Sequence, residues 1–222
     1  MNPRKRVSSQ ERRELILQAV IPVFAEKGFH GATTKSLAEA AGVSEALLYK
    51  HFPSKESLYS GIFLRHLDEK TQNPATQELL SEPASTRKLI RLLSLLHRDI
   101  AESEDPCLAR LMAQSLLSDG AFAQTVLDTF EQNFMHLFVE SLEAAHRSGD
   151  LSPGSDSSRL PIWFTHHLAV TFKLLSLPPR NLITYGKDRR SVSEEALRFC
   201  LRGIGIRPSA IEDHLLTTGD PK

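Results

Sequence analysis

The stretch from Thr33 to Phe52, TTKSLAEAAGVSEALLYKHF, constrains the fold of this chain more than any other. Thr33 or Thr34 can cap the start of a first helix, because a hydroxyl oxygen accepts a hydrogen bond from an otherwise unpaired amide. Gly42 ends that helix, since glycine adopts positive φ without a steric penalty. Ser44 can then cap a second helix. The pattern predicts two short helices joined by a tight turn.

The second of these helices has an inner and an outer face. Leu48 and Phe52 are four residues apart and are expected to face inward. The residues expected to face outward are Ser44, Glu45, Leu47, Tyr49, Lys50 and His51. Two helices joined by a short turn, with polar residues on the outer face of the second, fit the major groove of B-DNA. We therefore interpret the stretch as a helix-turn-helix.

The segment from about Arg12 to Leu58 resembles the DNA-binding domain of TetR-family transcriptional regulators. The matching residues stand at fixed spacing and are Phe24, Gly28, Thr33, Thr34, Leu37, Ala38, Ala41, Gly42, Val43, Ser44, Leu48, Tyr49, His51, Phe52, Ser54, Lys55 and Leu58. Ala46, Leu47 and Pro22 depart from the common family pattern. The resemblance implies an all-α fold of about nine helices. In that fold an N-terminal three-helix DNA-binding domain precedes a C-terminal helical domain for ligand binding and dimerisation.

The resemblance and the groove geometry together give the candidate DNA-binding residues. Tyr49 is expected to bond a phosphate, as the resemblance implies. The first turn of a reading helix reaches base edges, where Leu47 could contact a thymine methyl and Glu45 could accept from a cytosine amino group. The full set is Arg4, Lys5, Arg6, Thr33, Thr34, Lys35, Ser44, Glu45, Ala46, Leu47, Tyr49, Lys50, His51 and Lys55. For His51 a structural hydrogen bond is the alternative.

Charge is unevenly distributed along the chain. The formal net charge is zero, but residues 1–60 hold nine Lys and Arg against six Asp and Glu, a surplus of +3. A basic end on a neutral protein indicates a local electrostatic footprint for a polyanion. Arg4, Lys5 and Arg6 could lie along a minor groove or a phosphate strand, or form a solvated terminus.

The remainder of the chain shows helical periodicity and no alternating β pattern. We expect helices at Ser9–Lys27, Ser85–Glu102, Gly120–Arg147, Ser157–Leu175 and Ser193–Gly203, another opening at Asp105-Pro106, and a proline-containing break over 71–84. The predicted domains are a DNA-binding domain over 1–60, an effector-binding and dimerisation domain over 61–207, and a tail over 208–222.

Two further interactions are expected of the C-terminal domain. Its helices at about 157–176 and 193–203 stand where the resemblance places a four-helix homodimer interface. Aromatic and other side chains could line a site for a small apolar or amphipathic effector, and the alternative is an ordinary core. These candidates are Met112, Phe130, Phe134, Phe138, Trp163, His167 and Phe172.

Other function classes receive little support. The histidines His97, His136, His146, His166 and His167 lack the spacing of a known ligand set, so no metal site or cofactor is predicted. No catalytic motif is present, which favours a binding protein over an enzyme. No signal-peptide-like run or membrane-spanning apolar stretch occurs, and Cys107 and Cys200 are expected to be free thiols. We therefore expect a cytoplasmic protein that does not enter a membrane.

The functional prediction is a ligand-responsive transcriptional regulator. It would bind a near-palindromic DNA operator as a homodimer, act as a repressor, and be released when a small molecule binds the C-terminal domain. One alternative is an architectural DNA-binding protein without an effector. The other is an enzyme or carrier whose N-terminal helices only pack.

Overall fold

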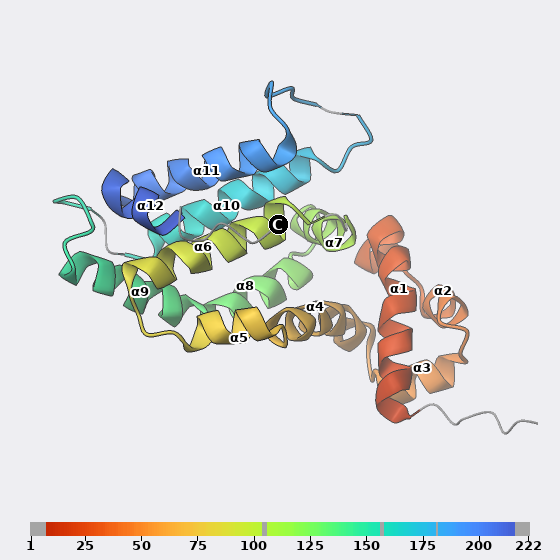
Figure 1. Cartoon of the computed structure of the whole chain (residues 1–222). Coiled ribbons are helices and arrows are strands. Elements are labelled where there is room, and N and C mark those ends of the chain that lie inside the picture. The colour runs from red at the N-terminus through yellow and green to blue at the C-terminus, as the bar shows by residue number, and fades with distance from the viewer. Residues whose placement is uncertain (1–7, 104–105, 156–157, 181, 216–222) are drawn as a thin grey trace, which may run out of the picture. The chain divides into compact units, whose positions relative to one another are not determined.

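The computed structural model describes residues 8–103, 106–155, 158–180 and 182–215. These residues form twelve helices (Figure 1), which confirms the all-α prediction but exceeds the expected nine. No β-strand occurs among the described residues, where Leu151 and Ile206 form one isolated bridge. None of the described helices is long and apolar enough to cross a membrane. The chain divides into two compact units, each with its own core.

Unit 1 comprises the described residues of 8–73 and 106–127. Its helices are α1 (Ser9–Gly31), α2 (Thr34–Ala40), α3 (Glu45–His51), α4 (Lys55–Thr71), α7 (Cys107–Leu116) and the first part of α8 (Ala121–Asn133). Residues 106–127 were expected in the C-terminal domain. In the structure, α7 packs against α1, and Leu111 is fully buried in the core of unit 1. A functional division at residue 60 stays a prediction.

Helix α1 supplies the long side of the unit 1 core. Ser8 caps it with a reciprocal capping box, in which the Ser8 hydroxyl accepts from the Glu11 amide and the Glu11 carboxylate accepts from the Ser8 amide. Gly28 interrupts the helix with φ 69° and ψ 178°. The helical segment then continues to Gly31, four residues beyond the expected end at Lys27. Pro22 lies within the helix on an exposed side.

Unit 2 comprises the described residues of 74–103 and 128–215. Its helices are α5 (Pro74–Ser81), α6 (Thr86–Ala101), the rest of α8, α9 (Met135–Arg147), α10 (Leu160–Leu175), α11 (Arg189–Ile204) and α12 (Pro208–Leu215). Helix α6 packs against α9, α10 and α11 (Figure 1). Its apolar side therefore forms the centre of the second core, around Leu89, Ile90 and Leu93.

Three expected boundaries in unit 2 are wrong. The break over 71–84 contains α5, whose first residue is Pro74, a position where the missing N–H breaks no helical bond. The single helix expected over 120–147 is divided at Phe134, which has φ −128° and ψ −30° and packs its ring against Phe130. Helix α11 starts at Arg189 because the Asp188 carboxylate caps it, accepting from the Ser191 amide at 3.0 Å.

Candidate nucleic-acid interface

The two helices α2 and α3 begin at the caps that the sequence predicts. Thr33, not Thr34, caps α2, and its hydroxyl accepts a hydrogen bond of 3.1 Å from the Ser36 amide. Ser44 caps α3 by accepting a 3.2 Å hydrogen bond from the Leu47 amide. Between them Gly42 adopts φ 61°, a left-handed conformation that favours glycine. The two caps and the glycine turn therefore set the angle between α2 and α3 through interactions within this short stretch.

The inner sides of α2 and α3 are anchored in the unit 1 core. Leu37, Leu48 and Phe52 are each at most 3% exposed and pack in one cluster with residues of α1 and α4. Burial of each such side chain stabilises the fold by about 1.5–3 kcal/mol relative to an exposed side chain. Helix α3 is thus held by its inner face, and its outer face is left for other contacts.

The outer side of α3 carries the predicted candidate residues. Ser44, Glu45, Ala46, Tyr49 and Lys50 are exposed, whereas Leu47 and His51 are half-buried. On and before α2, Thr33 and Lys35 are exposed and Thr34 is half-buried. Arg4, Lys5 and Arg6 lie outside the described residues. The structure therefore brings together an exposed polar face, and its contacts with DNA stay a prediction.

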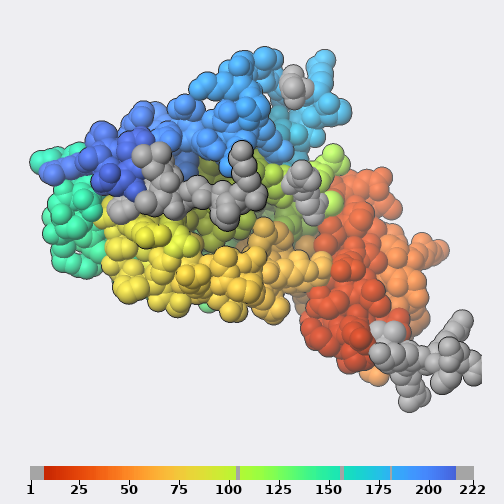
Figure 2. Space-filling view, viewed as in Figure 1, coloured from red at the N-terminus to blue at the C-terminus, as the bar shows by residue number. Residues whose placement is uncertain are grey.

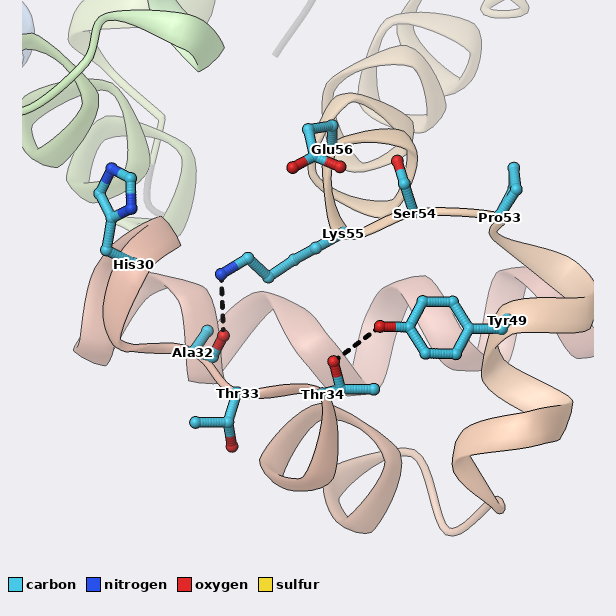
Figure 3. Close-up of a pocket in the computed structure, with 9 residues that line it drawn as sticks. All are labelled: His30, Ala32, Thr33, Thr34, Tyr49, Pro53, Ser54, Lys55 and Glu56. Atoms are coloured by element: carbon cyan, nitrogen blue, oxygen red, sulfur yellow. Dashed lines mark hydrogen bonds between the residues drawn. The ribbon is translucent and has the colours of Figure 1, made fainter.

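An open hollow of about 470 Å³ lies beside this face (Figure 3). Its lining comes from the end of α1, the start of α2, α3 and the start of α4, through His30, Ala32, Thr33, Thr34, Tyr49, Pro53, Ser54, Lys55 and Glu56. The hydroxyls of Thr34 and Tyr49 are 2.9 Å apart and share a hydrogen bond. This bond holds the Tyr49 phenol, which is 44% exposed, toward the start of α2.

Lys55 is directed toward the protein and not toward the solvent. Its ammonium donates hydrogen bonds to the carbonyl oxygens of Phe29 at 2.7 Å and Ala32 at 3.2 Å. It also lies 4.3 Å from the centroid of the Phe29 ring, a cation–π contact. Lys55 therefore joins the start of α4 to the loop between α1 and α2, a structural role that sequence reasoning did not assign.

A second structural cation, Arg13, was missed altogether. Its guanidinium donates to the backbone carbonyl of His51 and lies 4.1 Å from the centroid of the Phe52 ring. A cation at the last carbonyls of a helix also interacts favourably with the helix dipole. Arg13 and His51 are 38 positions apart in the sequence, and no local pattern marks the pair.

The charges of the hollow do not favour an anion inside it. Hydrogen bonding to the Ser54 side chain, followed by its own backbone amide, lowers the pKa of the Glu56 carboxyl. Glu56 therefore remains a carboxylate at neutral pH, and Lys55 is engaged with carbonyl oxygens. A phosphate inside the hollow would be repelled by Glu56 and would find the Lys55 ammonium already bonded to the protein.

The candidate effector residues are only partly brought together. In unit 2 the Phe130 ring packs against Phe134, Phe138 and Trp163, at centroid distances of 6.3, 5.6 and 5.5 Å. His167 stacks on Trp163 at 5.9 Å. Phe172 contacts Tyr185, and Met112 belongs to α7 in unit 1. Sequence reasoning missed His166, which is buried beside Phe130 and Trp163.

The capped pair α2–α3, with a buried inner side and an exposed polar outer side, forms a helix-turn-helix. Residues 16–62 match the sequence model of the family described as bacterial regulatory proteins, tetR family. This part of the chain is therefore similar to TetR-family regulators.

Individual relatives resemble the chain over different extents. It is 43% identical over 63 residues to the HTH-type transcriptional activator FasR of Mycolicibacterium smegmatis, which covers 28% of this chain and 29% of FasR. The fold is similar to that of FadR from Bacillus subtilis in complex with stearoyl-CoA, with 20% identity, TM-score 0.63, and 86% of this chain and 98% of FadR covered. It is also similar to that of AibR in complex with isovaleryl coenzyme A and operator DNA, with 14% identity and a TM-score of 0.61. This match covers 85% of this chain and 97% of AibR.

The similarity to curated relatives is concentrated in the N-terminal part. The aligned regions of the first relatives span 29% to 52% of their lengths. Because solved structures at these low identities establish the fold alone, the effector and the target DNA do not follow from them. Within the described residues, no group of three or more His, Cys, Asp or Glu side chains converges as metal ligands would.

Proposed function

We propose that the chain is an effector-responsive repressor that binds a near-palindromic operator as a homodimer. The observation that carries this proposal is the exposed outer side of α3, held in place by the buried Leu48 and Phe52. Its first turn, Ser44 to Leu47, would contact base edges in a major groove. Tyr49 and Thr34 would bond a phosphate strand, and Lys50 would add a charge contact.

Dimerisation is supported by apolar side chains on α10 and α11. Leu160 and Phe164 of α10 are 55% and 64% exposed, and Phe199 of α11 is 70% exposed. Figure 2 shows α11 at the surface of unit 2. Large apolar side chains gathered on neighbouring helices typically mark an interaction surface. The proposed occupant is the same face of a second copy, which would form a four-helix interface with two-fold symmetry.

Regulation by a small molecule is supported by the aromatic cluster of unit 2 and by the ligands of two structural neighbours, FadR and AibR. An effector that binds better to a state unable to span both half-sites would release the operator. A coupling free energy of about 1–3 kcal/mol corresponds to roughly a 5- to 150-fold loss of DNA affinity.

A gel-shift titration with duplexes from the region upstream of the chain's own coding sequence tests the proposal. Sequence-selective, salt-sensitive binding is expected. Tyr49→Phe and Lys50→Ala should each weaken it, and Lys50→Ala should reduce the salt slope by about one. The matched control is Arg110→Ala, which removes an exposed cation on α7 of the same unit. Absence of a selective shift on any duplex, or equal losses in the control, contradicts the proposal.

A further inference from the structure

The core of unit 2 contains buried polar atoms that have no hydrogen-bond partner among the described residues. They are Oγ of Ser141 on α9, Nδ1 of His166 on α10, and both ring nitrogens of His97 on α6. The exposed fractions are 0% for Ser141, 6% for His166 and 1% for His97. Such atoms are rare in folded proteins, because leaving them unpaired away from water destabilises the fold. They therefore indicate a missing polar partner.

His166 stands beside the aromatic cluster of unit 2. Its ring centroid is 6.0 Å from that of Phe130 and 5.6 Å from that of Trp163. Phe138 contacts Phe130 from α9 at 5.6 Å. Ser141 follows Phe138 by three positions and shares its side of the helix. One unpartnered polar atom, Nδ1 of His166, thus lies beside aromatic rings from α8 and α10, and a second, Oγ of Ser141, lies on the same side of α9 as Phe138.

His97 belongs to a different environment. Burial lowers the pKa of the His97 imidazole, whereas the charge of Glu102 and the backbone of Ser193 on α11 raise it by less. It is therefore left out of the site considered next.

The cations near this region are already occupied. Arg159, which precedes α10, forms an ion pair with Glu131. Near the other end of the helix, the Lys173 ammonium donates to the Ser103 carbonyl, and the Arg189 guanidinium donates to the carbonyls of Ala101 and Ser103. Burial, and secondarily the charge of His167, lowers the pKa of His166 to about 4, so its ring is neutral at pH 7. The surroundings suit an uncharged guest.

We infer that the effector is an uncharged molecule with an aromatic or aliphatic body and at least one hydrogen-bonding group, which it directs to Nδ1 of His166 and the hydroxyl of Ser141 against Phe130 and Trp163. This inference rests on the proposed function and specifies its effector class. Carboxylates are excluded as effectors, because their charge would have no counter-ion in this core.

Probes on one ring system separate these chemistries. We would titrate the full-length protein with 2-naphthol, naphthalene and 2-naphthoate. Calorimetry measures affinity. The chain has one tryptophan, so the indole N–H resonance of Trp163 reports where the probe binds. The inference predicts that 2-naphthol binds and shifts this resonance, naphthalene binds about tenfold more weakly, and 2-naphthoate does not bind.

Two variants test the named polar atoms. His166→Phe keeps an aromatic ring and removes both nitrogens, so 2-naphthol should bind about tenfold more weakly, at the level of naphthalene. Ser141→Ala should weaken it several-fold. The control is His136→Phe, at an exposed position of α9, which should leave affinity unchanged. In the ligand-free protein neither His166→Phe nor Ser141→Ala should lower the Tm, because neither removes a hydrogen bond.

The outcomes are distinguishable from failure of the proposed function. All variants should bind operator as well as the wild type when no probe is present, and only release by 2-naphthol should change. If the wild type binds no operator, the proposed function fails. The result of the probe titrations is then judged separately. Tighter binding of 2-naphthoate than of 2-naphthol, no binding of 2-naphthol at millimolar concentration, an unaffected His166→Phe variant, or a fall in Tm would overturn the inference.

Discussion

At the residue scale, the cations of unit 1 divide between those that hold the fold and those that remain at the surface. Lys55 and Arg13 bond backbone carbonyl oxygens and lie over aromatic rings, whereas Lys50 and Lys35 are exposed. All four belong to the basic N-terminal segment. Sequence position alone therefore does not tell which cations are available for DNA.

Lys55→Met should destabilise the protein in the absence of DNA. The change removes two hydrogen bonds to carbonyl oxygens and a cation–π contact, and we expect a loss of about 1–3 kcal/mol in the free energy of unfolding. Urea unfolding measures it. Lys35→Met, at an exposed position of α2, serves as the control and should change stability by less than about 0.5 kcal/mol. Equal stability of the two variants would contradict the structural role of Lys55.

The free energy of unfolding should fall as the pH is lowered from 6.5 toward 4, because the fold disfavours protonation of His166 in this range. Burial lowers the pKa of His166 from 6.5 to about 4 in the folded protein. The unfolded chain therefore binds more protons between these values, and stability is greatest above pH 6.5 and is lost progressively toward pH 4. The loss from this group is about 3 kcal/mol, and His97, whose pKa is also lowered by burial, adds in the same direction.

Thermal unfolding of the wild type and His166→Phe from pH 7.5 to 4.5 checks this. The variant should lose less stability on acidification than the wild type. Parallel pH profiles for the two proteins would show that His166 protonates as readily when folded as when unfolded.

At the element scale, α7 is part of the framework that supports α1. Leu111 is fully buried in the unit 1 core, and the Gln114 amide donates to the Ala25 carbonyl at 3.1 Å. The Tyr59 and Phe122 rings, from α4 and α8, are 4.8 Å apart. The helices that carry α2 and α3 are thus stabilised by a segment that follows them by some 50 residues.

Leu111→Ala should loosen unit 1 through α1. A buried Leu→Ala change costs about 2–5 kcal/mol, so the amides of Val20 to Ala25 should exchange with solvent faster. Amides of α11, in unit 2, serve as the internal reference and should change less. Hydrogen exchange that accelerates in α11 and not in α1 would contradict the assignment of α7 to unit 1.

The elements predicted correctly from sequence are those with local signals. Thr33, Gly42, Ser44 and the inward Leu48 and Phe52 act within one or two helical turns, so the helix-turn-helix could be placed before its structure was known. The division between α8 and α9 has no glycine or proline to mark it, and Phe134 at this division packs its ring against Phe130. The roles of Arg13 and Lys55, the burial of His166 and the membership of α7 in unit 1 all depend on contacts between distant residues.

At the scale of the whole molecule, the proposed function requires two copies of the chain. Phe164 and Phe199 are 64% and 70% exposed on neighbouring helices of unit 2. Phe164→Glu combined with Phe199→Glu should convert a dimer into a monomer by light scattering at micromolar concentration, because carboxylates would face each other across the interface. Leu117→Glu is the control, since Leu117 is 89% exposed but lies at the end of α7. A dimer that persists in the double variant would place the interface elsewhere.

The central claim is that the outer side of α3 reads bases and that a second subunit repeats this reading. Selection of binding sites by the full-length protein from a pool of randomised duplexes tests it most directly. The account predicts enrichment of a two-fold symmetric sequence, with half-sites about one helical turn or a multiple of it apart, and a changed base preference when Glu45 and Leu47 are replaced by Ala. An enriched sequence without symmetry, a preference unaffected by these substitutions, or no enrichment at all would contradict it.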